Sequence, residues 1–314
     1  MKLWWYKLTH WEFWPAYVIY IPTCIFWLGC MVRFRSFFFF SQSNPAFKNG
    51  GLYDDGKKSI YDLLPDILYP KTVLIAKDKW YDYDQILQQN NFTFPLIVKP
   101  DVGLRGIGVK MVSDCESIVA YSDWIDKDFL IQEQCKYPNE IGLFYCRIPG
   151  DAHGKITGIT IKEFLKVKGD GRSSIKDLLL QHPRYAMQIP KLKLQLNIEE
   201  VLQLNEERCL VPFGNHNRGT EFLDGQHFIT PKLEKTFDDM LNKIDGFYYG
   251  RLDIRYDNIA DLEAGKNFMV IEINGAKSEP THIYDPKHSF WYAQKEIFKH
   301  QKLFYRVVLE NYKK

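Results

Sequence analysis

The spacing of apolar residues along this chain predicts a series of strands and helices. Residues 250–257 (GRLDIRYD) and 268–276 (FMVIEINGA) are short segments with the apolar spacing of β-strands. Similar patterns predict strands at the end of 60–75 and at 94–100, 129–135, 142–150 and 155–164. Strands and helices do not follow a strict strand–helix–strand order, so we expect an α+β fold with mainly antiparallel sheets.

Helical spacing of apolar residues occurs at 82–92, 113–125, 173–186, 233–244 and 290–312. Ser113, followed three residues later by Glu116, predicts a capping box at the start of the second of these helices. Ser173 and Ser174 are expected to cap the third helix rather than to act in catalysis.

The N-terminal part of the chain contains a long uncharged segment, residues 13–32 (FWPAYVIYIPTCIFWLGCMV). As a helix it would span about 30 Å, the thickness of a bilayer's hydrocarbon core. Aromatic residues gather toward its first end, and Arg33 and Arg35 follow its last. Three arrangements remain open: a membrane-spanning or re-entrant helix, a helix in the membrane interface, or a core helix packed on the rest of the chain.

Composition narrows the class of protein. The 314 residues, 46% of them hydrophobic, allow two domains or one large domain. The formal net charge is only +2, from 41 basic and 39 acidic residues, which argues against a nucleic-acid partner. The six cysteines are scattered without a CxxC spacing, which argues against structural zinc and a disulfide scaffold and favours a reducing compartment.

Changes in composition divide the chain into three expected parts. Residues 1–40 are a hydrophobic, aromatic segment expected to associate with a membrane. Residues 41–69 are expected to be a linker, because 41–60 are rich in Ser, Asn, Gly, Asp and Lys. Residues 70–314 contain most of the predicted strands and form the expected main domain.

Oxygen-bearing side chains interrupt the two strands near the C-terminus. Asp253 lies in the first strand, and Glu272 and Asn274 lie two residues apart in the second, so these two share a face. If the strands pair, the three side chains converge into the kind of oxygen cluster that Mg²⁺ prefers, with Arg251 beside it. The alternative is a hydrogen-bonded polar patch at a sheet edge.

A glycine-rich turn follows the strand at 94–100. Lys99 ends that strand, and Gly103, Gly106 and Gly108 allow the backbone to approach a ligand closely. Backbone N–H groups in such a turn, with Lys99 and Arg105 nearby, would form an anion site for phosphates. The turn lacks the P-loop pattern GxxxxGK[ST].

Taken in order, these motifs resemble the ATP-grasp superfamily, which holds ATP between two α+β subdomains. Local similarity is greatest to D-alanine–D-alanine ligases and to the ligase domain of cyanophycin synthetase. The resemblance covers about residues 70–300 and makes 70–314 an ATP-grasp domain. The hydrophobic helical segment expected in front of it departs from the family, most members of which have a complete N-terminal α/β domain.

The resemblance also implies roles for individual residues. ATP binding is implied for Lys99, Arg105, Gly106 and Gly108 at the phosphates, Glu133 at adenine, Glu140 at the ribose, and Lys162 and Arg218 at the triphosphate. Metal binding is implied for Asp253, Glu272 and Asn274, and catalytic roles for Arg251 and Lys162. His282 and Tyr284 would either meet the substrate or make structural hydrogen bonds.

The implied function is an ATP- and Mg²⁺-dependent ligase, with Mn²⁺ as a possible substitute. It would activate a carboxylate as an acyl phosphate, join it to an amine or similar nucleophile, and release ADP and phosphate near the membrane. Because ATP is needed, the catalytic domain is expected in the cytoplasm, anchored through residues 13–32. The alternatives are an ATP-grasp phosphotransferase and a non-catalytic nucleotide-binding membrane module.

Overall fold

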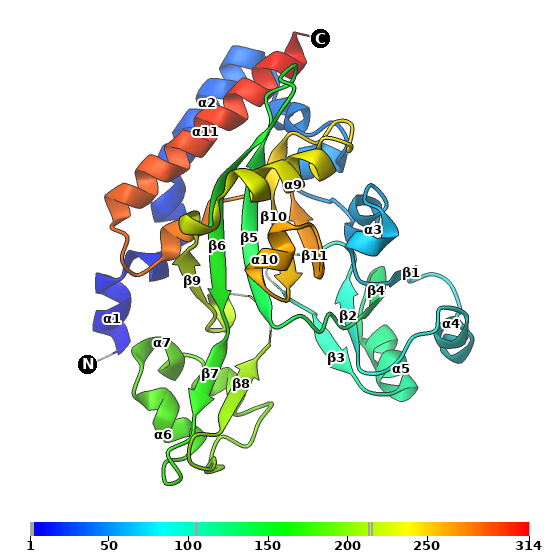
Figure 1. Cartoon of the computed structure of the whole chain (residues 1–314), viewed down its shortest axis with the longest axis vertical. Coiled ribbons are helices and arrows are strands. Elements are labelled where there is room, and N and C mark those ends of the chain that lie inside the picture. Colours follow the sequence, from blue (N-terminus) through cyan, green and yellow to red (C-terminus); the bar gives the residue numbers. More distant parts are fainter. Residues whose placement is uncertain (1–2, 104–105, 213, 215, 314) are drawn as a thin grey trace.

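The computed structural model describes residues 3–103, 106–212, 214 and 216–313. The strands in these residues form three antiparallel sheets, flanked by helices (Figure 1). The expectation of an α+β fold with mainly antiparallel sheets and an apolar N-terminal helix is therefore confirmed.

A four-stranded sheet, with strand order β1-β4-β2-β3, contains the glycine-rich turn. Its strands are β1 (Thr72–Ile75), β2 (Leu96–Pro100), β3 (Lys110–Val112) and β4 (Phe129–Glu133). Helices α4 (Tyr83–Gln89) and α5 (Cys115–Trp124) contribute apolar residues to its core, where Ile118 and Val98 are fully buried. This packing fixes the end of β2, from which Lys99 projects.

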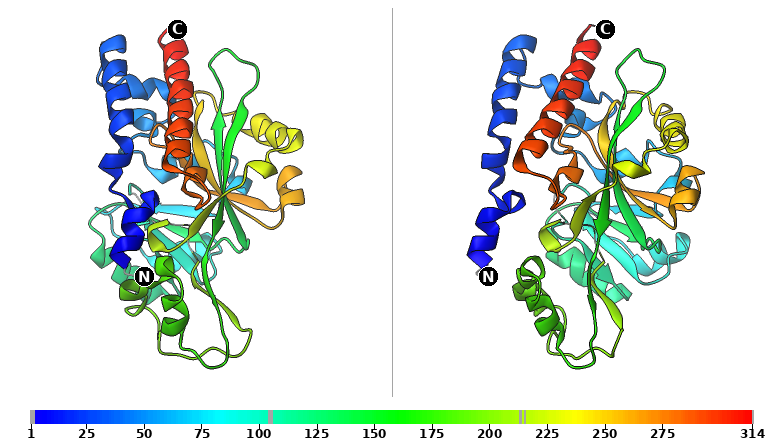
Figure 2. Two further views of the ribbon diagram at one scale, coloured as in Figure 1. Left: turned by 90° about the vertical axis from the view of Figure 1, so that its left-hand side faces the viewer. Right: turned by 60° about the vertical axis from the view of Figure 1, so that its left-hand side comes forward.

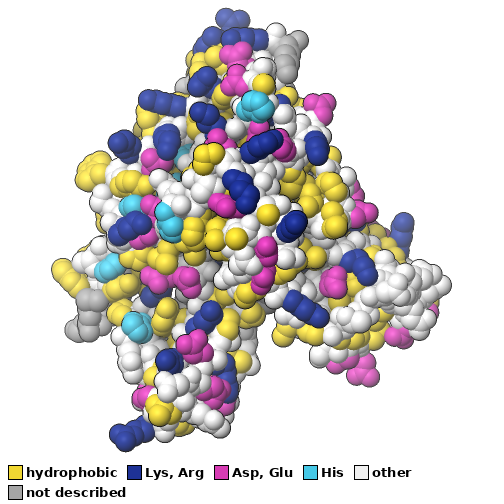
Figure 3. Space-filling view, viewed as in Figure 1, with side chains coloured by type: hydrophobic (Ala, Val, Ile, Leu, Met, Phe, Trp, Pro, Cys, Tyr) yellow, Lys and Arg dark blue, Asp and Glu magenta, His cyan; other side chains and the backbone are white. Residues whose placement is uncertain are grey.

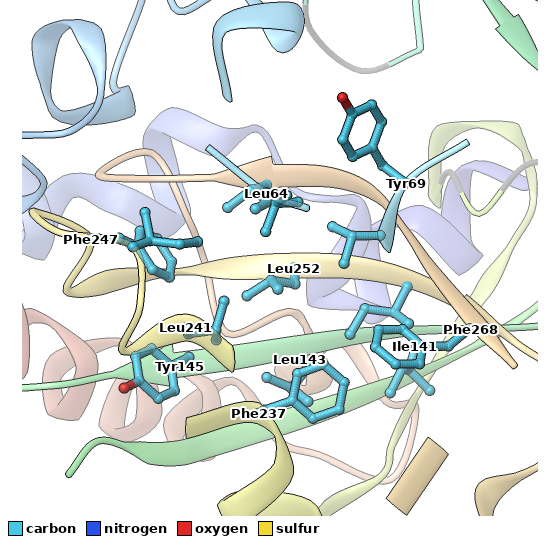
Figure 4. Close-up of a cluster of buried hydrophobic side chains, with 14 of the residues drawn as sticks. Leu64, Tyr69, Ile141, Leu143, Tyr145, Phe237, Leu241, Phe247, Leu252 and Phe268 are labelled. Atoms are coloured by element: carbon cyan, nitrogen blue, oxygen red, sulfur yellow. The ribbon is translucent and has the colours of Figure 1, made fainter. Parts of the chain in front are cut away.

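A five-stranded sheet with the order β11-β10-β5-β6-β9 forms the centre of the molecule. Its strands are β5 (Asn139–Cys146), β6 (Lys155–Glu163), β9 (Glu221–Asp224), β10 (Tyr249–Tyr256) and β11 (Phe268–Asn274). Helices α9 (Pro231–Leu241) and α10 (Ile259–Glu263) cover one face, where Leu143, Phe237 and Leu252 belong to one buried cluster (Figure 4).

The opposite face of the central sheet is covered by α11 (Phe290–Tyr312), which has the bounds predicted for the last helix. Neighbouring residues of a strand point to opposite faces, so Phe144 faces away from Leu143. Phe144 belongs to the same buried cluster as Phe304 of α11. The sheet therefore has helices on both faces.

A smaller unit is inserted in the chain between β6 and β9 of the central sheet. It contains the two-stranded sheet β7 (Leu165–Lys168) and β8 (Glu207–Val211), with α6 (Ile175–Leu180), α7 (Pro183–Ala186) and α8 (Ile189–Leu192). The helix predicted at 173–186 is divided here, because Pro183 begins a new helix with His182 as its N-cap. The apolar pattern predicted neither β7 nor β8.

The predicted N-cap is correct at Ser174 of α6, and at α5 the observed N-cap lies one residue after the predicted Ser113. Ser174 caps α6 in a capping box with Asp177, as expected of a cap. Helix α5 has Asp114 rather than Ser113 as its N-cap, and Asp114 Oδ1 accepts from Ser117 N at 2.8 Å. Both residues suit an N-cap, and the chain uses the one that immediately precedes Cys115.

The N-terminal segment consists of α1 (Leu3–Thr9), the 3₁₀ turn η1 (Trp11–Phe13) and α2 (Ala16–Phe34). Helix α2 runs beside α11 and forms the outermost layer of the molecule (Figure 2). Within the described part of the chain, α2 is the one helix whose length and composition would allow it to cross a membrane.

The segment expected to be a linker packs closely on the central sheet. It contains η2 (Phe39–Ser43), η3 (Lys48–Gly51), α3 (Lys57–Tyr61) and η4 (Asp66–Leu68). One of its polar residues, Asn44, is buried. Asn44 Oδ1 accepts hydrogen bonds from the backbone N–H groups of Tyr248 and Tyr249, each at 2.9 Å. The segment has the polar composition of a loop although part of it is buried, because its polar side chains form hydrogen bonds with buried backbone groups.

Candidate active site

A cleft lies between the four-stranded sheet and the central sheet. It contains about 1150 Å³ of empty space, part of it open to solvent. Predicted site residues that line it are Lys99, Gly106, Glu133, Glu140, Lys162, Arg218, Asp253 and Glu272. Gly108, Arg251 and Asn274 are described but do not line it, and Arg105 lies outside the described residues.

The register of β10 and β11 brings the polar positions of the two strands together. Asp253 is directly opposite Glu272, and Arg251 is directly opposite Asn274. Opposed residues of antiparallel strands share a face, and so do residues two apart on one strand. All four side chains therefore lie on one face of the sheet, and β5 beside them adds Glu140 opposite Arg255.

Lys162 of β6 is the centre of a buried charge network in this cleft. Its Nζ lies 2.7 Å from Glu140 Oε1 and 3.1 Å from Asp253 Oδ2. Burial lowers the pKa of Lys162, but the two carboxylates outweigh burial and hold that pKa above its usual value. Lys162 is therefore a permanent cation in the wall of the cleft.

Asp253 has a second cationic partner. Arg251 Nε donates to Asp253 Oδ1 at 2.9 Å, and Arg251 Nη2 lies 3.3 Å from Oδ2. Burial raises the pKa of Asp253, but Arg251 and Lys162 outweigh it and keep the pKa below its usual value. The carboxylate is therefore ionised at neutral pH.

Lys99 approaches the cleft from the four-stranded sheet. Its Nζ donates to Gln132 Oε1 at 2.8 Å and to Tyr61 Oη at 3.0 Å. Burial lowers the pKa of Lys99 to about 8, opposed by the charges of Glu272 and Asp101. Among the described residues, the hydrogen-bond partners of its Nζ are neutral, and an anionic ligand would stabilise its charged form.

The glycine-rich turn has the backbone that its sequence predicts. Gly106 and Gly108 have φ values of +67° and +78°, which other residues rarely adopt. Lys57 of α3 holds the start of the turn, since its Nζ donates to the carbonyls of Pro100, Asp101 and Gly103 at 3.3, 3.0 and 3.2 Å. Lys57 also lines the cleft, and sequence reasoning missed it because it lies in the expected linker.

The remaining predicted residues lie at the two ends of the cleft. Glu133 ends β4, where the chain passes from one sheet to the other, and lines the cleft wall. Arg218, in η5 (His216–Arg218), lines the opposite side together with Gly214. A Cβ at Gly214 would overlap Glu140 Oε1 and Lys162 Cδ, so Gly214 lies directly against the buried network.

The oxygen set on β10 and β11 fits a hard cation such as Mg²⁺. Asp253 and Glu272 supply two opposed carboxylates, and no ion pair links Glu272 to another described residue. Asn274 Nδ2 is buried without a hydrogen-bond partner in the described part of the chain. This nitrogen is a donor, so only Oδ1 of the amide could bind a cation. The described residues contain no group of three or more His, Cys, Asp or Glu side chains placed for a metal, and the role of Asn274 as the third ligand remains a prediction.

A second polar cluster, which sequence reasoning did not assemble, lies beside Arg251. The Glu279 carboxylate accepts hydrogen bonds from Tyr284 Oη at 2.8 Å and from Tyr20 Oη of α2. Among the described residues, no cationic side chain forms an ion pair with Glu279. His282, the other candidate in this segment, is fully buried beside Glu296 and belongs to the structure behind the sheet.

No family model and no curated protein matches this chain. Among solved structures it is similar to a D-alanine–D-alanine ligase from Bacillus anthracis (14% identity, TM-score 0.44, 82% of this chain and 67% of that one). It is also similar to a bifunctional glutathione synthetase from Pasteurella multocida (15%, 0.41, 79% and 35%). A third similar structure is the VanG D-Ala:D-Ser ligase from Enterococcus faecalis (14%, 0.41, 78% and 61%).

These solved structures are ATP-grasp ligases, the superfamily that the sequence motifs resemble. The chain spans about a third of the glutathione synthetase and less than two thirds of the VanG ligase. Similarity at this level concerns the fold and does not show which reaction this chain catalyses.

Proposed function

We propose that this chain is an ATP- and Mg²⁺-dependent ligase that joins a carboxylate to an amine or similar nucleophile, with release of ADP and phosphate. One observation carries the proposal: Lys99 and Lys162 enter one cleft from two different sheets, next to the opposed carboxylates Asp253 and Glu272. Buried cations and a metal-binding oxygen set in one cleft suit the polyphosphate of a nucleotide.

The first proposed step is phosphoryl transfer. A carboxylate oxygen of the substrate attacks the γ-phosphorus, the bond from that phosphorus to the bridging oxygen of ADP breaks, and an acyl phosphate forms. Two anions must approach each other, so the step requires positive charge around the phosphates. We assign this charge to Lys99 and Lys162, with Arg105, Arg218 and the N–H groups around Gly106 and Gly108 holding the phosphates.

Asp253, Glu272 and Asn274 would hold Mg²⁺ or Mn²⁺, which would neutralise phosphate oxygens when bound. Glu133 and the neighbouring backbone are assigned to adenine, and Glu140 to the ribose. Glu140 has an additional role in this proposal, because its carboxylate also pairs with Lys162 and with Arg255 Nε at 3.1 Å. It therefore fixes the position of the lysine that contacts the phosphates.

The second proposed step forms the amide. The ammonium group first loses a proton to solvent, and the resulting amine nitrogen attacks the acyl carbon. The bond from that carbon to the phosphate oxygen breaks, and phosphate leaves with the electron pair and takes up the second proton that the nitrogen loses. Arg251 is assigned to the oxyanion that forms on the acyl oxygen, and Asp253 holds its guanidinium in place. Glu279 is assigned to the amine, because a carboxylate without a cationic partner favours an ammonium group.

The proposal also covers the organisation of the chain. We assign residues 70–314 to an ATP-grasp domain in the cytoplasm, preceded by a membrane-associated segment (1–40) and a connecting segment (41–69). Tyr61 supports including the connecting segment in the working enzyme, since its hydroxyl contacts Lys99 Nζ.

The decisive experiment compares Glu272→Gln with the wild type in thermal unfolding, with ATP, with Mg²⁺, and with both. The matched control is Glu116→Gln, which changes an exposed carboxylate on α5. We expect ATP with Mg²⁺ to raise the Tm of the wild type and the control but not of Glu272→Gln. An equal rise in Glu272→Gln would overturn the metal assignment, and no rise in any protein at millimolar ATP would overturn the nucleotide site.

A product assay then separates a ligase from other ATP-grasp chemistry. Pairs of carboxylates and amines are screened for ADP release, and the products are weighed by mass spectrometry. A product that contains both substrates without phosphorus supports the ligase. A phosphorylated product without the amine would show a phosphotransferase instead.

A further inference from the structure

One face of α2 is apolar and exposed along the whole helix. The residues of this face, called the apolar strip below, recur every three or four positions: Val18, Ile21, Ile25, Leu28 and Val32. Ile25 is 65% exposed and Val32 is 79% exposed. A strip of this length facing water is costly, because each exposed aliphatic side chain forgoes about 1.5–3 kcal/mol of burial.

The other face of α2 is fixed to the protein. Trp27 stacks on Phe304 of α11 with ring centroids 5.3 Å apart, and Trp27 Nε1 donates to Gln301 Oε1 at 2.6 Å. Phe34 stacks on Tyr312 at 4.9 Å. Helix α2 is thus held along α11 nearly to its last turn (Figure 2), and the side chains of the apolar strip are exposed on its other side.

Exposed aromatic residues mark the ends of the apolar strip. Trp4 and Trp5 of α1 are 66% and 49% exposed, and Phe37 and Phe38 follow α2 with 76% and 61% exposed. Aromatic residues of this kind are enriched where the hydrocarbon core of a bilayer meets its headgroups. The apolar surface of the segment therefore extends from α1 past the end of α2.

The exposed charges around the apolar strip have one sign. Within residues 3–38 the exposed charged side chains are Lys7, Arg33 and Arg35, and the single acid, Glu12, is paired inward with Arg184. The exposed charged residues of α11 up to position 306 are Lys295, Lys299, Lys302 and Arg306. Figure 3 shows dark blue side chains, with some magenta ones, among yellow ones over the part of the molecule where α2 and α11 lie.

We propose that the apolar strip lies in the plane of a membrane and docks this chain on an anionic bilayer surface. The bilayer interface would bury the strip by roughly 5–10 Å, and the basic residues would contact lipid phosphates. Tyr20, on the inner side of the same helix, contacts Glu279 beside Arg251, so docking would hold that end of the active site close to the membrane.

The same contacts argue against the other arrangements of α2. A spanning α2 would have to leave α11 or carry the lysines of α11 into the bilayer, at about 2.5–3.5 kcal/mol for each one near the centre. A second copy of the chain packed on the strip about a two-fold axis would bring one basic rim against the other. An anionic surface complements both the apolar residues and the charges.

Flotation of the purified full-length protein with lipid vesicles, in the absence of ATP, tests the proposal independently of the ligase reaction. We expect binding to vesicles of phosphatidylcholine mixed with phosphatidylglycerol, and much weaker binding to phosphatidylcholine alone. Ile25→Asp with Leu28→Asp should reduce binding by about tenfold or more, since each places a charge in the interface. Arg33→Gln with Arg35→Gln should remove most of the dependence on anionic lipid and on salt.

The matched control places the same charges on apolar residues that are exposed elsewhere. Ile67 and Leu194 are 81% and 79% exposed, and their double Asp variant should bind vesicles as the wild type does. Binding by Ile25→Asp with Leu28→Asp at the wild-type level, with an unchanged Tm, would overturn the docking surface. In cell membranes, resistance to alkaline carbonate extraction would show a spanning helix instead, and a dimer that this variant dissociates, without vesicle binding, would show a second copy.

Discussion

Glu12, in the turn between α1 and α2, forms an ion pair with Arg184 of α7, although 172 residues separate them in the chain. Glu12 Oε2 also lies 3.1 Å from His216 Nε2 of η5, whose Arg218 lines the candidate cleft. The side chains of Glu12 and Arg184 are almost completely buried. Glu12 therefore connects the N-terminal segment to the small β7–β8 unit through Arg184 and to η5 through His216.

Removing the charge of Glu12 should destabilise this junction. In Glu12→Gln the Arg184 guanidinium would remain buried without its carboxylate, which costs about 3 kcal/mol in typical buried pairs. Denaturant unfolding of the variant and the wild type measures the difference. As a control, Glu310→Gln breaks a surface pair with Lys313 and should change stability by about 0.5 kcal/mol or less.

The same junction should make stability depend on acid pH. Burial raises the pKa of Glu12, but the hydrogen bond to His216 and the charge of Arg184 outweigh it, so the folded-state pKa lies below the unfolded one. The stability from this shift is present above the unfolded pKa and is lost as the pH falls through the folded pKa. The free energy of unfolding, measured from neutral pH into that acid range, should fall less steeply with pH for Glu12→Gln than for the wild type. An equal slope for the two proteins would contradict this prediction.

Lys99 should make ATP binding sensitive to alkaline pH. Its folded pKa is about 8 because burial disfavours the charge, so the ammonium that would meet phosphate is present below that pH and lost above it. ATP affinity should therefore fall as the pH rises through about 8. Calorimetric titration of ATP across this range measures the effect.

Lys99→Arg is the control for this pH dependence, because the guanidinium of arginine keeps its charge throughout the range. Its ATP affinity should change little around pH 8, whatever its absolute value. Lys99→Met should bind ATP weakly at every pH. An unchanged pH profile in Lys99→Met would show that another group titrates.

Asn44 should contribute strongly to stability although it lies in a loop-like segment. Besides accepting from two backbone N–H groups, its Nδ2 donates to the carbonyls of Tyr249 and Gly50 at 2.8 and 3.1 Å. Asn44→Ala would leave several buried backbone groups unpaired and should cost about 3 kcal/mol of unfolding free energy. Gln88→Ala, at an exposed position of α4, should have an effect near zero in the same denaturant experiment.

The sequence predicted the strands of the candidate site because their signals are local. A carboxylate in an apolar strand, such as Asp253 or Glu272, is conspicuous in its own segment, and the strand period then gives the shared face. The pairing of Asp253 with Glu272 depends on the register of the two strands, which shifts at a β-bulge after Asp253. No local sequence pattern predicts this bulge. The roles assigned to these residues remain predictions.

Contacts between distant segments could not be predicted in this way. Tyr20 and Glu279 are 259 residues apart, and the apolar surroundings of Tyr20 indicated only a hydrophobic helix. The burial of Asn44 could not be predicted, because the sequence does not distinguish an Asn that pairs with buried backbone from an Asn in an exposed loop. The break at Pro183, by contrast, had a local signal, since the residue before proline disfavours a helix.

The Tyr20–Glu279 contact leads to a prediction that separates amine binding from nucleotide binding. Glu279→Gln keeps an acceptor for both tyrosine hydroxyls and removes only the negative charge. If Glu279 holds the ammonium group of the nucleophile, the KM for the amine should rise about tenfold, the usual size of one lost charge-assisted hydrogen bond. The Tm increase caused by ATP with Mg²⁺ should stay as in the wild type.

Tyr20→Phe distinguishes charge from position at the same site. The hydroxyl of Tyr20 orients the Glu279 carboxylate without adding charge, so its loss should raise the KM for the amine by a smaller factor than Glu279→Gln does. A different result is expected if Glu279 serves mainly to hold Arg251, whose pKa its charge helps to raise against the effect of burial. In that case kcat would fall while the KM for the amine stayed constant, and the assignment of Glu279 to the nucleophile would be wrong.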